Sequence, residues 1–235
     1  MVTPEVLARI ATIGPYFAVG TGPRPDGFRP LTELYEDGAA LDTCVRAVAD
    51  RLGTDRPRVA ASTLHLGTAS RLWSLALACA AYTGRVPDLH PGRLWWRLPA
   101  SGPLDLWLTA PGTLDEEDPR TALHRTVVVG NLTPWADAVR RTYGLSPHTL
   151  RGNAASALIG AHRVLLTRAP RTRFPVVPLV RALLDHPPLA GAGTYDAAPD
   201  RPLTFRRRSC CLYYRVPGAG TCGDCVLTTH REKTP

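Results

Sequence analysis

The sequence predicts an α+β protein with a helix-rich body, a small antiparallel sheet and a C-terminal cysteine-rich, cluster-binding segment. Three observations support this fold class. Several long stretches repeat apolar residues every three or four positions, as amphipathic helices do. Two short apolar runs flank a Gly/Pro-rich loop, which is typical of a hairpin. Four of the six cysteines lie close together after the last of these elements.

Length and composition indicate an ordinary globular chain. With 235 residues it can bury a hydrophobic core without disulfide bonds. An apolar content of 44% and a charged content of 20% exclude disordered and collagen-like proteins. The longest strongly apolar stretch, residues 72–82, is about half the length of a membrane helix, and no basic segment followed by an apolar run marks a secretory signal. We therefore expect no membrane span and a cytoplasmic location, where thiols stay reduced.

The first half of the chain predicts two helices. Apolar residues recur at helical intervals over residues 31–52, and Gly53 stands where this helix should end. Ser62 is suited to cap a second helix that runs through Tyr82, with Gly84 at its end.

The central part predicts strands. Residues 94–98 and 104–108 are the two apolar runs around the Gly/Pro loop and form the expected hairpin. Residues 123–129 end in three valines, and because β-branched residues favour strands, they predict a third strand.

Helical signals return in the second half. Thr133 and Ser146 each precede a proline, a pairing that is common where a helix begins. The helix that follows Ser146 has the clearest apolar stripe in the chain. Residues 174–184 predict a shorter helix.

These elements suggest three parts. Residues 1–184 form the helix-rich body with its small sheet, and residues 185–202 have the Pro/Gly-rich composition of a connector. Residues 203–235 form the C-terminal segment that holds the clustered cysteines.

The clustered cysteines have the spacing Cys-Cys-x10-Cys-x2-Cys, formed by Cys210, Cys211, Cys222 and Cys225. Four thiolates suit zinc or an iron–sulfur cluster, and a Cys-x-x-Cys pair can hold one metal ion. Neighbouring side chains of an extended strand point to opposite faces, so Cys210 and Cys211 can serve one centre only where the backbone bends. A two-iron cluster offers two metal atoms for the four cysteines to bind, whereas zinc offers one. This difference favours [2Fe–2S].

This segment resembles the FhuF-like ferric siderophore reductases, whose C-terminal motif has the same spacing. Residues 208–214 and 222–225 also look like that family. A second similarity is Gly152-Asn153-Ala154-Ala155-Ser156-Ala157 on the long helix, with Arg151 where the family leads us to expect an aromatic residue.

The resemblance implies a function. It implies a [2Fe–2S] cluster on the four cysteines and a ferric siderophore reductase, an oxidoreductase acting on metal ions, which reduces siderophore-bound Fe(III) and releases Fe(II) in the cytoplasm. No catalytic residue beyond the cluster is expected, because electron transfer needs no acid–base pair. The expected partners are a ferric siderophore and a separate electron donor, a reductase or a ferredoxin, since no Gly-rich dinucleotide fingerprint is present.

Basic residues surround the cysteines. Residues 201–235 carry six arginines and one lysine against Asp224 and Glu232, in a chain of net charge +8. A nearby positive charge would favour the reduced, more negative cluster and could steer an anionic ferric complex or an acidic donor. No helix-turn-helix or aromatic-rich signature accompanies the charge, so we expect no nucleic-acid partner. The candidates for steering are Arg206, Arg207, Arg208 and Arg215.

Two other functions fit the same residues. The protein could be a non-enzymatic binding protein with a structural zinc site on the four cysteines, or an iron–sulfur electron carrier or redox sensor. Cys44 and Cys79 lie on or beside apolar helix faces and are expected in the core. His65 and His162 also fall on or beside such faces, where a core or boundary position is expected.

Overall fold

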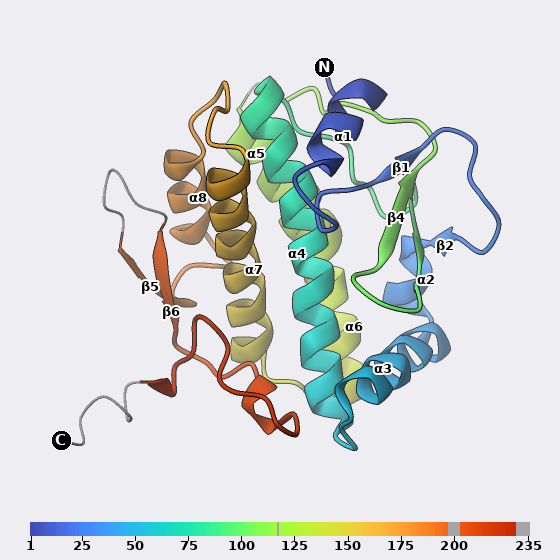
Figure 1. Cartoon of the computed structure of the whole chain (residues 1–235), viewed down its shortest axis with the longest axis vertical. Helices are drawn as coiled ribbons and strands as arrows, with labels where there is room; N and C mark the ends of the chain where they lie inside the picture. The colour runs from blue at the N-terminus through green and yellow to red at the C-terminus, as the bar shows by residue number, and fades with distance from the viewer. Residues whose placement is uncertain (117, 197–202, 229–235) are drawn as a thin grey trace.

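The computed structural model describes residues 1–116, 118–196 and 203–228. Its helices surround one central helix, α4 (Figure 1). They are α1 (Pro4–Ala11), α2 (Leu31–Glu36), α3 (Gly38–Leu52), α4 (Pro57–Thr83), α5 (Pro119–Leu123), the π-helix η1 (His124–Leu132), α6 (Thr133–Tyr143), α7 (Pro147–Arg168), α8 (Val177–Leu184) and the 3-10 helix η2 (Tyr213–Arg215). The helix-rich α+β class is therefore confirmed. No helix in these ranges is long and apolar enough to span a membrane.

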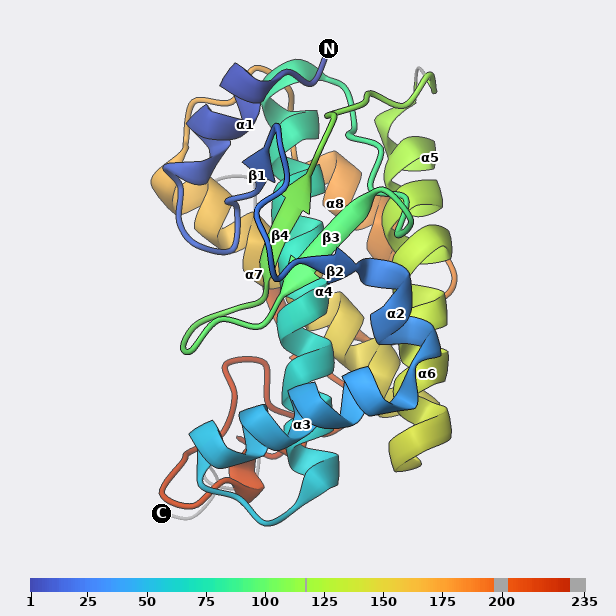
Figure 2. The ribbon, with the colours of Figure 1, turned by 90° about the vertical axis from the view of Figure 1, so that its right-hand side faces the viewer.

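Helix α4 is the centre of the core. It packs along α7 over much of its length and also contacts α1, α3 and α6 (Figures 1 and 2). Because neighbours cover it on several sides, its apolar residues face all directions rather than one stripe. The helix begins at Pro57, so Ser62 is not its cap but a buried residue of its second turn. Gly84 ends it in a left-handed conformation, as predicted.

The single helix predicted for residues 31–52 is two helices. Asp37 has extended backbone angles between α2 and α3, and its Oδ1 accepts a hydrogen bond from the amide of Ala39 at 2.9 Å. The prediction missed this break because Leu34 and Leu41 are seven residues apart, a spacing that two full helical turns would also produce.

The predicted hairpin is confirmed as β3 (Leu94–Arg97) and β4 (Asp105–Leu108), which pair antiparallel. Two-residue strands extend it to the order β1-β4-β3-β2, with β1 (Gly20–Thr21) and β2 (Arg29–Pro30) at the edges. Since β1 runs parallel to β4, the sheet is mixed rather than wholly antiparallel. The difference comes from these short N-terminal segments, which carry no strand pattern in the sequence.

The third strand predicted for residues 123–129 is wrong. These residues belong to a continuous helical run from α5 through η1 into α6, so Thr133 lies inside the run instead of capping a helix. Val127 and Val128 are buried, whereas Val129 is 56% exposed. This is the pattern of a helix face, and core packing here outweighs the β-preference of valine.

The second half otherwise follows the prediction. Ser146 caps α7, and its Oγ accepts a hydrogen bond from the amide of His148 at 3.2 Å. Helix α8 begins at Val177, a few residues later than expected.

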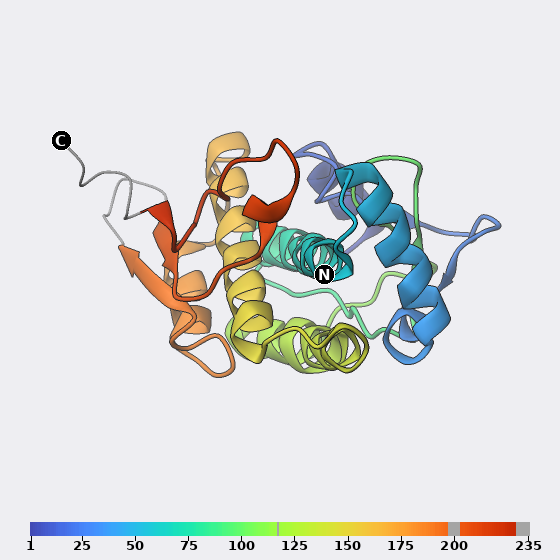
Figure 3. The same ribbon diagram turned by 90° about the horizontal axis from the view of Figure 1, so that it is seen from below.

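A second small sheet begins the C-terminal segment. Strand β6 (Thr204–Arg207) pairs antiparallel with β5 (Gly193–Asp196), which lies in the stretch predicted to be a connector. Residues 197–202 of that connector lie outside the described residues, as do residues 229–235 of the C-terminal segment. After β6 the chain crosses the ends of α7 and α4 that lie on the same side of the molecule (Figure 3).

Candidate metal centre

The four clustered cysteines lie on two loops of the segment after β6. Cys211 and Cys225 are buried, while Cys210 and Cys222 are half-buried, and none of the four forms a disulfide. The backbone bends directly after the adjacent pair, because Leu212 has a φ of 71°, an uncommon conformation for a residue other than glycine. This is the kind of bend that an adjacent pair requires. The thiols of Cys211 and Cys222, one from each loop, shift each other's pKa in opposite directions.

Backbone amides surround the sulfur atoms in a repeated arrangement. The amides of Leu212 and Leu227 donate to the Sγ atoms of Cys210 and Cys225, each at 3.3 Å. The amides of Tyr213 and Asp224 act on Cys211 and Cys222 and favour their thiolates. In each case the amide belongs to the second residue after the cysteine. Such amides stabilise negatively charged sulfur, which is the form that binds metal.

The interaction between Cys211 and Cys222 favours a thiolate at Cys211 and a protonated thiol at Cys222. The hydrogen bond from Cys222, together with amides and a nearby arginine, lowers the pKa of Cys211 to about 6. The same hydrogen bond and burial raise the pKa of Cys222. Burial also raises the pKa of Cys210. Among the described residues, no three His, Cys, Asp or Glu side chains form a ready site for a metal ion.

Arg207 is the buried cation of this centre, with only 2% of its surface exposed. Its Nε donates to the carbonyl oxygen of Ser209 at 3.0 Å, and its Nη2 donates to the carbonyl oxygen of Thr149 at 3.1 Å and to Oδ1 of Asn153 at 2.7 Å. Burial lowers the pKa of Arg207, whereas the thiol groups of Cys210, Cys211 and Cys222 oppose that shift. The guanidinium is therefore fixed on α7 with its charge acting on three of the four sulfur sites.

A polar network joins the cysteine loop to α4 and α7. The Nδ2 of Asn153 donates to the backbone and side-chain oxygens of Ser62, each at 3.0 Å. The Oγ of Ser62 in turn donates to the carbonyl oxygen of Cys211 at 2.8 Å. Thr149 donates to the carbonyl oxygen of Cys210 at 3.3 Å. These side chains position the adjacent cysteines. The sequence does contain a signal for Asn153, because this residue lies in the second stretch that resembles the family, residues 152–157.

Gly152 allows the loop to approach α7. A Cβ atom there would lie 2.8 Å from Nη2 of Arg207 and closer still to Oγ of Ser209. We expect Gly152→Ala to displace the cysteine loop and to destabilise the protein by about 1–3 kcal/mol, the usual cost of overpacking. Thermal unfolding and iron content after reconstitution measure the two effects.

Gly160→Ala is the matched control for this prediction. Gly160 lies on the same helix with open space around its Cα, so alanine should raise helix stability by up to about 1 kcal/mol and leave iron content unchanged. Equal iron content and stability in both variants would show that Gly152 is not needed for close approach.

The second cysteine loop is also tied to α7. Nη1 of Arg163 forms an ion pair with Oδ1 of Asp224 at 2.7 Å, and Nε of Arg163 donates to the carbonyl oxygen of Leu203 at 3.1 Å. The amide of Arg207 donates to the carbonyl oxygen of Asp224 at 3.1 Å, which joins the Cys222–Cys225 loop to β6. Nothing in the sequence pattern singled out Arg163.

The structure separates the four arginines that were candidates for steering. Arg206, Arg208 and Arg215 are exposed, whereas Arg207 is buried. Nε of Arg215 donates to the hydroxyl of Tyr214 at 2.9 Å. Only the exposed three can meet a partner from solution. Cys44 and Cys79 are fully buried in the core, away from the cluster of four.

A basic cleft lies beside the cysteine loop. Its volume is about 500 Å³, and its wall combines the start of α4 with Leu212 and Arg215 of the C-terminal segment. Arg56 and Arg58 add two positive charges, against one carboxylate, Asp55. Sequence reasoning missed these two arginines because about 150 residues separate them from the cysteines and no motif contains them.

The family model of the FhuF 2Fe-2S C-terminal domain matches residues 207–227, a range that contains all four clustered cysteines and begins at the buried arginine. No curated protein matches the chain significantly. The match favours the iron–sulfur alternative over the zinc site. Residues 207–227 of this chain are therefore similar to the FhuF 2Fe-2S C-terminal domain, which is a [2Fe–2S] cluster-binding domain.

Proposed function

We propose that this protein is a cytoplasmic ferric siderophore reductase, whose [2Fe–2S] cluster is held by Cys210, Cys211, Cys222 and Cys225. The observation that carries the proposal is the set of polar groups around each of these sulfur atoms, since the described residues show no ready four-sulfur site. An amide favours the thiolate at each of the four positions, and the charge of Arg207 acts on three of them. This donor set fits a negatively charged iron–sulfur group.

The chemistry needs one electron at a time. Siderophores bind Fe(III) far more tightly than Fe(II), because hard oxygen donors prefer the smaller and more highly charged ion. A [2Fe–2S] cluster supplies single electrons, so one transfer converts the bound Fe(III) to Fe(II) and weakens the complex. The residues of the chain bind and orient the ferric complex, and none is required to move a proton.

The basic cleft provides the docking position in this proposal. Arg56, Arg58 and Arg215 attract an anionic ferric complex to the surface beside Leu212, the residue directly after Cys211. The exposed Arg206 on β6 and the exposed Arg208 directly after it would attract an acidic electron donor. Residues 1–184 act as the body that holds this surface, residues 185–202 as the connector, and residues 203–235 as the segment that carries the cluster.

A single-turnover experiment tests the proposal. Protein reduced with dithionite and freed of excess reductant should be reoxidised by a ferric siderophore, one electron for each Fe(II) captured by a ferrous chelator. Reoxidation should be fastest with anionic ferric complexes at low salt. A protein that holds the cluster but transfers no electron to any ferric siderophore would be an electron carrier or redox sensor instead.

Removing charge from the cleft should slow this reaction. We expect the double variant Arg56→Gln/Arg58→Gln to lower the rate with an anionic complex several-fold at low ionic strength, with the difference shrinking at high salt because exposed charges are screened. Stopped-flow reoxidation at several salt concentrations measures the effect.

Arg173→Gln is the control for this pair. Arg173 is exposed and precedes α8, outside the cleft, so the loss of its charge should leave the rate nearly unchanged. If the control slows the reaction as much as the double variant, net charge rather than the cleft determines the rate.

A further inference from the structure

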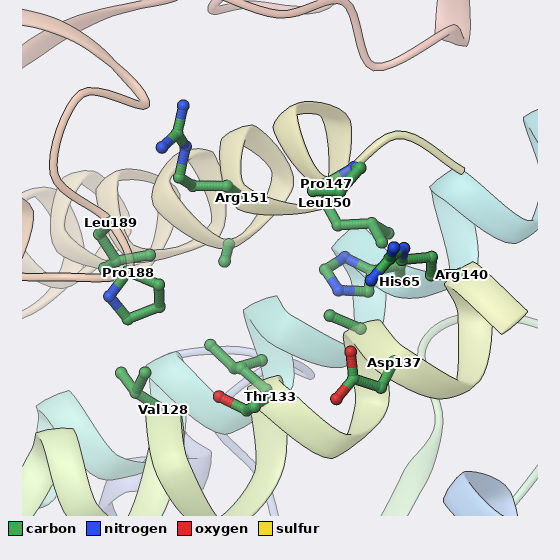
Figure 4. A pocket seen from close by; sticks show the side chains of 13 residues that line it. His65, Val128, Thr133, Asp137, Arg140, Pro147, Leu150, Arg151, Pro188 and Leu189 are labelled. Carbon is green, nitrogen blue, oxygen red and sulfur yellow. The ribbon is translucent and has the colours of Figure 1, made fainter. Parts of the chain in front are cut away.

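A second cavity lies between α6 and α7, with α4 at its base (Figure 4). Its volume is about 170 Å³, close to the roughly 150 Å³ cavity that holds a benzene molecule in an engineered protein. Most of its wall is apolar. The apolar lining residues are Val128, Leu132, Ala136, Pro147, Leu150, Ala154, Pro188 and Leu189.

One buried polar side chain faces this cavity without a partner. His65 is 1% exposed, and among the described residues neither of its ring nitrogens has a hydrogen-bond partner. Its ring stacks on Trp135 with centroids 6.1 Å apart and an interplanar angle of 6°, so its orientation is fixed. Burial, with a smaller effect from the charge of Arg207, lowers the pKa of His65 to about 3. The ring is therefore neutral near pH 7 and presents one N–H donor and one nitrogen acceptor.

The charged residues at the cavity select the charge of an occupant. Arg140 and Asp137 of α6 line the cavity together with His65 (Figure 4). Arg140 and the His65 N–H are both donors, and together they suit one carboxylate group. Asp137 would repel a second negative group. The guanidinium of Arg151 points away from His65 in Figure 4, and its Nη2 contacts Nδ1 of His148 at 3.1 Å.

We propose that this cavity binds a small monocarboxylate with an apolar, ring-sized body. The carboxylate meets Arg140 and His65, and the body fills the space between the apolar side chains of η1, α6 and α7. The site is distinct from the cysteine loop, although both use α4: Ser62 supports Cys211, and His65 lies one turn later on the same helix. The sequence predicted a core or boundary position for His65. The structure confirms that His65 is buried and shows that its ring nitrogens have no hydrogen-bond partner among the described residues.

Calorimetric titration of the full-length holoprotein with benzoate tests the proposal. We expect saturable binding of one benzoate per chain, with no comparable binding of phenol, which lacks the charge, or of inorganic phosphate, which lacks the ring. Saturation-transfer NMR should place the benzoate ring in contact with protein side chains. Absence of saturable benzoate binding, or equal binding of phenol or phosphate, would overturn the proposed ligand class.

Matched variants locate the site. Arg140→Gln should weaken benzoate binding at least tenfold, whereas Arg141→Gln on the same helix should change it less than twofold, because Arg141 does not line the cavity and donates instead to the carbonyl oxygen of Tyr35 at 3.3 Å. His65→Phe keeps a ring against Trp135 and removes both nitrogens, so it should also weaken binding at least tenfold. Should His65→Phe fail to fold, the two arginine variants still decide the location. Equal affinity in the Arg140→Gln and Arg141→Gln variants would place benzoate elsewhere.

Discussion

Replacing Cys222 by serine should abolish the [2Fe–2S] cluster. Cys222 is one of the four sulfur ligands that we propose for the cluster, and serine replaces its sulfur with a weaker, harder oxygen ligand. Iron and sulfide content after anaerobic reconstitution should fall by at least about tenfold, and the visible absorption that bleaches with dithionite should disappear. The protein should remain folded, because Cys222 is not part of the main hydrophobic core.

Cys44→Ala is the control for this substitution. Cys44 lies on α3 and is fully buried in the hydrophobic core. Alanine at this position should lower the unfolding free energy only modestly and leave the iron content at the level of the unaltered protein. Retention of two irons and two sulfides by Cys222→Ser would show that the cluster uses another ligand set.

Replacing Arg207 by methionine should have the second-largest effect. Reduction adds one negative charge to the cluster, and a buried cation stabilises that charge more than an exposed one. Its loss should lower the reduction potential by about 59 mV or more, which is a tenfold change for a one-electron couple. The substitution also removes the donors to Ser209, Thr149 and Asn153, so the unfolding free energy should fall as well.

Two further variants separate charge from packing. Arg206→Met removes a charge from the neighbouring, exposed position of β6 and should change the potential far less. Arg207→Lys keeps the charge without the planar fork that reaches three acceptors, so it should restore much of the potential but not the stability. Redox titration followed by EPR measures the potential. Equal shifts for the Arg206→Met and Arg207→Met variants would mean that burial of Arg207 has no special role.

Periodicity predicted most of the helices, because a helix that buries one face has apolar residues every three or four positions along the sequence. It failed where tertiary packing decided the outcome. Val127, Val128 and Val129 have the composition of a strand, yet they occupy a helical run between α5 and α6. Asp37 interrupts a regular apolar pattern through local backbone geometry, which no apolar spacing records.

The cysteine motif predicted the ligand candidates, but their surroundings come from distant parts of the chain. Ser62 precedes Cys211 by 149 positions, and no short motif could link them. The burial of Arg207 could have been predicted from its neighbours in the sequence, although its positive charge suggested an exposed position. Phe205 and Arg207 lie on the same face of β6, so the strand alternation that buries the phenylalanine also buries the arginine.

The side-chain network from Ser62, Thr149 and Asn153 holds the Cys210–Cys211 loop through protein atoms alone. The loop is therefore attached to the helical body by protein atoms, but no three potential metal ligands of the described residues lie together as a ready site. Binding of a cluster thus requires the cysteine side chains of the two loops to move toward one another.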